Sequence, residues 1–287
     1  MLSPSTARSR RARILIGLVA LASVGGAAAR TQTRQALAQQ PPAAARAASA
    51  SALPARASIA PAPAVERPEP AARNPVWIQP EGNKQIPILA YPPSSPRAAP
   101  LMVMLHGMCD VPQNECPSFA VPSTAGRWLV CPRANIACDG GGAIWSGEPR
   151  TRAELVDRTV ERMRTSFPGR FDEAAASTLV GFSLGSFVAV DVAQRSHGQW
   201  KNLLLIGAKV EPDARLLQLA GVQNVMLASG DRDMMKWHMV GVAARLQRRG
   251  VRATFVSMGN VGHWFADDMD QWLANAMQWF ENKEEGG

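Results

Sequence analysis

The octapeptide Thr178-Leu179-Val180-Gly181-Phe182-Ser183-Leu184-Gly185 is an apolar run that ends at a serine between two glycines. Residues 178–182 are typical of a buried strand, and the chain from Leu184 onward is typical of a helix. The G-x-S-x-G pattern therefore lies at a strand-to-helix turn, where larger side chains beside the serine would clash. Such a turn places the Ser183 hydroxyl at a helix N-terminus, beside free backbone N–H groups. We predict that Ser183 is a nucleophile; a serine that only caps the helix is the alternative.

Short apolar runs alternate with amphipathic stretches on both sides of this turn. Expected strands cover residues 76–78, 86–90, 101–105, 127–131, 178–182, 202–210, 225–229 and 251–258, and expected helices cover residues 151–167, 184–195, 237–249 and 266–282. This alternation predicts an α/β fold with a mostly parallel sheet of about eight strands and helices on both faces. The first two runs, joined by a turn at 81–83, predict a hairpin at one edge. Only 14 residues separate Val210 from Val225, so we expect no large lid there.

A serine hydroxyl needs a base to take its proton. The chain has four histidines, and His263 follows the last expected strand in a glycine-flanked loop. Ligand sites of parallel sheets lie at that end of the strands, so we predict His263 as the base. The other three histidines are expected to be structural or solvated: His106, His197 and His238.

The base needs an acid that fixes its tautomer. Asp231 and Asp233 both follow the expected strand 225–229. One of them is expected to meet His263, and the other to cap the turn or to pair with Arg232.

The negative charge that develops on a substrate carbonyl needs N–H donors aimed at it. The N–H of Leu184, directly after the nucleophile, is one candidate. The second is expected from the loop after strand 101–105, where Gly107 allows close approach and Met108 supplies the N–H. His106 is expected to hold this loop by hydrogen bonds.

The four cysteines of the chain lie within 30 residues, at positions 109, 116, 131 and 138. Zinc sites favour shorter C-x2-4-C spacings, so two disulfides are favoured over a metal site. We prefer the local pairs Cys109–Cys116 and Cys131–Cys138. The crossed pairing that contains Cys109–Cys131 stays open, and free buried thiols are the remaining alternative.

The net charge of +8 is concentrated before residue 74. Residues 1–38 hold six arginines and no acid, residues 39–73 hold four arginines and two acids, and residues 74–287 hold 21 basic and 21 acidic side chains. We predict a signal peptide over 1–38, a disordered Ala/Pro-rich spacer over 39–73 and a catalytic domain over 74–287. The protein is then exported, to the periplasm or outside the cell, with no stable membrane insertion after cleavage; an uncleaved anchor is the alternative. A neutral catalytic domain gives no reason to expect a nucleic-acid partner.

Four motifs resemble those of the α/β-hydrolase superfamily, in particular its carboxylesterase/phospholipase and dienelactone-hydrolase-like branches. They are His106-Gly107-Met108-Cys109-Asp110, Gly181-Phe182-Ser183-Leu184-Gly185, Gly230-Asp231-Arg232-Asp233 and Gly262-His263. The chain departs from the family at Cys109, where H-G-x-G-D has a glycine, and at Ser186, where many members have a second glycine.

The resemblance implies a triad of Ser183, Asp233 and His263, because the acid is the fourth residue of the family's G-x-x-D pattern. It also implies oxyanion donors at Met108 and Leu184. Trp145 lies where related esterases carry a tryptophan at the site, and it is expected with Trp264 to bind substrate; core packing is the alternative for both.

The expected function is that of a serine hydrolase that cleaves small-molecule carboxylic esters through an acyl-serine, without a metal or an organic cofactor. Activity should rise with pH as His263 loses its proton. The alternatives are a serine peptidase or amidase, a polyester or feruloyl esterase of biopolymers, and a non-catalytic binding protein on the same fold.

Overall fold

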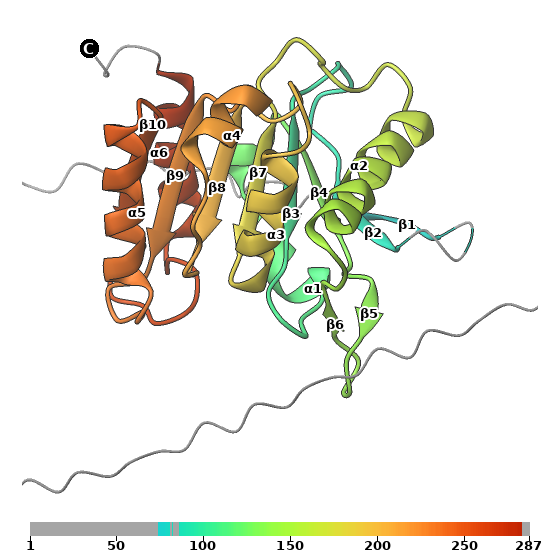
Figure 1. Cartoon of the computed structure of the whole chain (residues 1–287). Coiled ribbons are helices and arrows are strands. Elements are labelled where there is room, and N and C mark those ends of the chain that lie inside the picture. Colours follow the sequence, from blue (N-terminus) through green and yellow to red (C-terminus); the bar gives the residue numbers. More distant parts are fainter. Residues whose placement is uncertain (1–73, 81, 83–85, 283–287) are drawn as a thin grey trace, which may run out of the picture. The chain divides into compact units, whose positions relative to one another are not determined.

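The computed structural model describes residues 74–80, 82 and 86–282 (Figure 1). The predicted signal peptide and spacer lie outside the described residues, as do positions 81 and 83 of the predicted turn. Within the described ranges, none of the helices combines the length and the apolar character that a membrane span requires.

The main sheet has eight strands in the order β1-β2-β4-β3-β7-β8-β9-β10. Their bounds are Val76–Ile78 (β1), Ile88–Tyr91 (β2), Leu101–Leu105 (β3), Trp128–Pro132 (β4), Thr178–Phe182 (β7), Asn202–Ile206 (β8), Asn224–Ser229 (β9) and Arg252–Ser257 (β10). β2 pairs antiparallel with both β1 and β4, and all other pairs are parallel. The predicted sheet, with its antiparallel hairpin at one edge, is therefore confirmed.

Alternating side chains of the central strands face two apolar cores. Leu101, Val103 and Leu105 of β3 belong to one core, and Met102 and Met104 belong to the other. The helices that contribute to the first core are α2 (Pro149–Ser166), α3 (Leu184–Ala193), α4 (Ala214–Ala220) and α5 (Lys236–Arg248). The second core is covered by α6 (Met269–Glu281) and the 3₁₀ helix Cys116–Phe119. Figure 1 shows α2, α3 and α5 in front of the sheet and α6 behind it, which confirms the prediction of helices on both faces.

Several short elements of the structure were not predicted from the sequence. They are α1 (Pro112–Glu115), a 3₁₀ turn at Pro122–Thr124, the small hairpin of β5 (Ile136–Ala137) and β6 (Ala143–Ile144), and α4. The 14-residue connection holds α4, whose N-cap is Asp213 and whose Leu217 is buried in the first core. This helix packs on the sheet, so the connection adds no large lid over it.

The two disulfides are Cys109–Cys138 and Cys116–Cys131. The preferred local pairs are therefore wrong, and so are the crossed pairing and the free thiols. The reason lies in the short elements: Ala143 of the β5–β6 hairpin bonds to Asp110 and brings Cys138 beside Cys109. The segment after α1 packs Cys116 into the same core as Cys131 of β4.

Candidate active site

Ser183 lies at a tight turn between β7 and α3. Its φ of 51° and ψ of −118° make it, with Cys109, one of two non-glycine residues with positive φ in the described part of the chain. This conformation is costly for an L-residue and persists only when its surroundings enforce it. A Cβ at Gly181 would lie 2.4 Å from the carbonyl oxygen of Gly185, and a Cβ at Gly185 would lie 2.0 Å from that of Leu105. The flanking glycines thus allow the close packing that aims the serine outward.

His263 and Asp233 lie together at the same edge of the sheet. His263 Nδ1 is 2.9 Å from Asp233 Oδ2, while Asp233 Oδ1 accepts a hydrogen bond from the N–H of Met235. The two loops that carry them are in close contact, since the N–H of Arg232 donates to the carbonyl of Val261 at 3.0 Å. Asp233 is buried, which holds its carboxylate against the imidazole in the arrangement expected of an acid that orients a base.

Asp231, the competing acid, faces away from the histidine. It accepts hydrogen bonds from Lys236 Nζ at 2.8 Å and from Ser257 Oγ at 2.6 Å. The hydrogen bond from Lys236 is the main reason that the pKa of Asp231 lies below its usual value. From the sequence, Arg232 is one partner expected for the aspartate that does not meet His263. In the structure the partner of Asp231 is Lys236 instead.

The imidazole of His263 lies beside the serine turn. Its ring centroid is 5.1 Å from that of Phe182, the residue before Ser183. A Cβ at Gly207 would lie 3.0 Å from His263 Cε1 and 3.2 Å from Asp233 Oδ2. The residue before Gly207 is Ile206, and its carbonyl accepts the N–H of Ser183. Among the described residues, neither Ser183 Oγ nor His263 Nε2 has a hydrogen-bond partner, so no hydrogen bond joins the two atoms, and the His263 side chain is 46% exposed.

Two backbone donors are available at the serine. In the described part of the chain, the N–H groups of Met108 and Leu184 donate to no other group. The loop that carries Met108 packs on the serine, because a Cβ at Gly107 would lie 3.5 Å from Ser183 Cβ. Free N–H groups at this position have the chemistry of an oxyanion hole.

Comparison with known proteins gives matches among solved structures. No protein-family model matches the sequence, and no curated protein matches it. Esterase PE8 is 21% identical over 68% of this chain and 98% of its own, with a TM-score of 0.54. The fluorophosphonate-binding serine hydrolase F of Staphylococcus aureus is 13% identical over 74% of this chain and 99% of its own, also with a TM-score of 0.54. An S-formylglutathione hydrolase of Agrobacterium tumefaciens is 13% identical over 72% of this chain and 93% of its own, with the same TM-score.

The chain has the α/β-hydrolase fold. The candidate nucleophile, acid and base, Ser183, Asp233 and His263, follow one another along the sequence in the order found in that fold.

The loop that carries the candidate oxyanion donor Met108, residues 106–110, is called here the oxyanion loop and is held by contacts inside the protein. Buried His106 donates from Nδ1 to the carbonyl of Gly107 at 2.8 Å and accepts the N–H of Ala134 at Nε2, 3.0 Å away. Burial lowers the pKa of His106, which keeps the ring neutral for this pair of bonds. Its expected structural role agrees with these contacts.

The two tryptophans expected to bind substrate lie in different environments. Trp145 is only 3% exposed, and its indole N–H donates to the carbonyl of His106 at 2.9 Å. It therefore offers almost no surface to a substrate, and we reassign it to supporting the oxyanion loop. Trp264 is half exposed beside His263, with its ring edge-on to Phe182.

Four large, exposed apolar side chains lie at, or close in sequence to, the candidate site residues and are called here the apolar rim. Their exposed fractions are 63% for Met108, 85% for Met234, 77% for Trp237 and 47% for Trp264. Met234 and Trp264 are the chain neighbours of Asp233 and His263, Met108 is in the oxyanion loop, and Trp237 is in the first turn of α5. Exposed apolar patches mark surfaces that bind apolar ligands, so these four side chains are candidates for such a surface.

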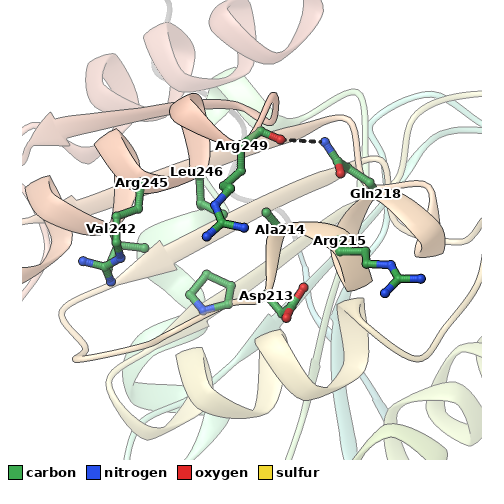
Figure 2. A pocket seen from close by; sticks show the side chains of 9 residues that line it. Asp213, Ala214, Arg215, Gln218, Val242, Arg245, Leu246 and Arg249 are labelled. Atoms are coloured by element: carbon green, nitrogen blue, oxygen red, sulfur yellow. Dashed lines mark hydrogen bonds between the residues drawn. The ribbon is translucent and has the colours of Figure 1, made fainter.

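Two sizeable cavities of the described structure lie elsewhere. One of about 450 Å³ lies between α4 and α5, where Figure 2 shows Asp213 between Arg215 and Arg249, with Arg245 farther away. Another, of about 790 Å³, lies at the opposite end of the sheet, beside the first residues of β8, β9 and β10. Neither is lined by a predicted site residue.

One buried acid at the site was missed by the sequence analysis. Glu115 is fully buried at the end of α1, and one of its carboxyl oxygens accepts the N–H of Gly107 at 2.9 Å. One feature of the sequence could have indicated this burial: Glu115 directly precedes Cys116, and a residue next to a buried disulfide is drawn toward the interior.

Proposed function

We propose that this protein is an exported serine hydrolase that cleaves carboxylic esters through an acyl-serine intermediate. The observation that carries the proposal is the Asp233–His263 pair, 2.9 Å apart, beside a strained serine at the end of β7. The likeness to esterases and serine hydrolases supports it at the level of the fold.

In the proposed reaction, Ser183 Oγ attacks the acyl carbon while His263 Nε2 takes the hydroxyl proton. The carbonyl π electrons move to oxygen, and the resulting oxyanion is bound by the N–H groups of Met108 and Leu184. The intermediate then expels the alcohol, which receives the proton from His263. Water attacks the acyl-serine, again with His263 as base, and releases the carboxylic acid and Ser183.

The apolar rim favours esters with an apolar acyl or alcohol part. A ligand that covers Met234 and Trp237 would remove exposed apolar surface from water, which stabilises the complex. An open, apolar site also suits a polyester, and that is the second candidate.

Export is supported by the predicted signal peptide and by two disulfides, which persist in oxidising compartments. Thiol trapping tests this part of the proposal. The exported protein should have no reactive thiol, and a chain without residues 1–38 that stays in the cytoplasm should have four.

The test of the mechanism is labelling with a fluorophosphonate, which reacts with an activated serine. We expect the wild type to be labelled and to cleave 4-nitrophenyl esters, and Ser183→Ala to do neither. Ser166→Ala is the control, because Ser166 is exposed at the end of α2, away from the site. Labelling of Ser183→Ala would overturn the mechanism.

A substrate panel separates the alternatives. Turnover of anilides faster than of matched esters would favour an amidase, and release of acid from a solid polyester would favour the polymer. A wild type that is folded but neither labelled nor active would favour a binding protein.

A further inference from the structure

Glu115 is a buried carboxyl group directly behind the oxyanion loop. The N–H of Gly107 points to both of its oxygens, at 2.9 Å for Oε1 and 3.2 Å for Oε2. A Cβ built on Gly107 would lie 3.1 Å from Glu115 Oε1 and 3.5 Å from Ser183 Cβ. Gly107 is thus packed between the Glu115 carboxyl group and the candidate nucleophile.

The groups around Glu115 leave its charge without a positive partner. The Asp110 carboxylate is hydrogen-bonded to the Glu115 carboxyl and faces it from the oxyanion loop. Two other titratable groups lie near this pair. His106 lowers the pKa of Asp110, and Arg133 lowers the pKa of His106. Among the described residues, neither of them shifts the pKa of Glu115. Two carboxyl groups in contact cannot both be ionised without a large cost, so one of them holds a proton.

The proton belongs on Glu115. Asp110 is half-buried and accepts hydrogen bonds from the N–H of Val111 at 2.8 Å and from the side chain of Asn114. Burial alone would raise the pKa of Asp110, but these bonds and the one from Glu115 bring it below the usual value. For Glu115, burial raises the pKa to about 9, against a smaller lowering by the N–H of Gly107.

We propose that Glu115, in its neutral form, is a positioning residue for the oxyanion hole. It accepts the N–H of Gly107 and donates its own proton to Asp110, and so fixes the peptide that precedes the Met108 donor. The inference rests on the proposed function, because the oxyanion hole matters only if an oxyanion forms. Neutrality is essential, since a negative charge behind the loop would oppose the charge that develops on the substrate.

The proposal predicts an alkaline decline of kcat. When the pH passes the pKa of Glu115, its proton is lost and the residue becomes an anion beside Asp110 and the oxyanion loop. Wild-type kcat should therefore fall between about pH 8 and pH 10, around the value of about 9 given by burial.

The deciding variants are Glu115→Gln and Glu115→Ala, assayed for ester turnover in the full exported chain. The amide of Gln reproduces the neutral acid, with an oxygen for Gly107 and an N–H for Asp110. Ala removes both bonds, and we expect kcat to fall by about 10- to 100-fold with a smaller change in KM. Gln should rescue most of that loss and, because it does not titrate, should abolish the alkaline decline.

Asp157→Asn is the matched control. Asp157 on α2 is another carboxyl group whose pKa is raised by burial, and it accepts a hydrogen bond from Ser196. Since it lies away from the oxyanion loop, its variant should keep the wild-type pH profile.

The outcomes separate the two proposals. A wild type without labelling or turnover defeats the proposed function itself. An active wild type whose alkaline decline persists in Glu115→Gln, or Glu115→Ala with wild-type kcat, overturns the role of Glu115 alone. If Glu115→Ala fails to fold, the pH profile of Glu115→Gln still decides.

Discussion

At the scale of single residues, Asp231 and Asp233 provide a matched pair for testing the candidate triad. Asp233 is bonded to His263 Nδ1, whereas Asp231 is bonded to Lys236 and Ser257. We expect Asp233→Asn to reduce kcat about 1,000-fold or more, because the amide favours the wrong imidazole tautomer. Asp231→Asn should stay within about twofold, since it loses only exposed bonds. An equal loss in both variants, measured as kcat on one ester, would contradict the assignment of the acid.

The raised pKa of Glu115 also predicts how the free energy of unfolding depends on pH, independently of activity. Its pKa of about 9 in the folded state lies above the ordinary value of 4.5 that applies to the unfolded chain. Between these values the unfolded chain has lost the proton that the folded protein keeps. The free energy of unfolding therefore decreases as pH rises, by up to about 1.4 kcal/mol per pH unit from this group.

Glu115→Gln removes this dependence. Its free energy of unfolding, measured with urea from pH 5 to pH 9, should increase relative to that of the wild type across the range. Parallel curves for the two proteins would show that Glu115 is not held neutral.

At the scale of elements, local pattern predicted the long elements and missed the short ones. β3 and β7 have the bounds expected from sequence, because each is a continuous apolar run that is buried on both faces. The strand expected over 202–210 ends at Ile206 instead, where Gly207 takes a positive φ. The β5–β6 hairpin and α1 have no apolar periodicity that a sequence pattern could reveal. They are held instead by disulfides and by contacts with residues distant in sequence.

The same limit applies to the candidate site. Ser183, Asp233 and His263 follow strands that pattern reveals, so a topology of parallel strands is enough to bring them together. The burial of Glu115 and Trp145 depends on the unpredicted elements and on disulfide pairing, which spacing alone does not determine.

The disulfide Cys109–Cys138 joins the oxyanion loop to the β5–β6 hairpin. Its two cysteines are 29 residues apart in sequence, and closing a loop of that length should stabilise the protein by about 3.5 kcal/mol. We expect the double variant Cys109→Ala/Cys138→Ala to lower the free energy of unfolding by about this amount and to reduce kcat, because the loop loses its anchor to the hairpin.

Peptide mapping without reduction checks the pairing directly. A fragment containing Cys109 should be recovered joined to one containing Cys138, and a fragment containing Cys116 joined to one containing Cys131. Recovery of Cys109 joined to Cys116 would contradict the structure.

At the scale of the whole molecule, charge and apolar surface suggest different roles for different parts of the chain. The excess of positive charge lies before residue 74, while residues 74–287 are neutral. The basic character of the chain therefore agrees with the predicted signal peptide and gives no reason to expect a polyanionic partner of residues 74–287. The apolar rim is the second distinctive surface feature, and its members come from three separate segments: the 106–110 loop, the turn and first helical residues after β9, and the loop after β10.

A substitution of Trp237 tests whether the acyl chain of a substrate lies on the apolar rim. It is 77% exposed at the start of α5, so an acyl chain lying across it would bury apolar surface that is otherwise in water. Burial of about 50 Å² is worth about 1 kcal/mol, or about a fivefold change in affinity. Trp237→Ala should therefore raise KM about fivefold for octanoyl or longer esters and leave acetyl esters nearly unchanged. Trp77→Ala is the control, because Trp77 is an exposed tryptophan on the edge strand β1. Equal KM changes for short and long esters in Trp237→Ala, or an effect of the same size in Trp77→Ala, would show that the acyl chain does not lie on the rim.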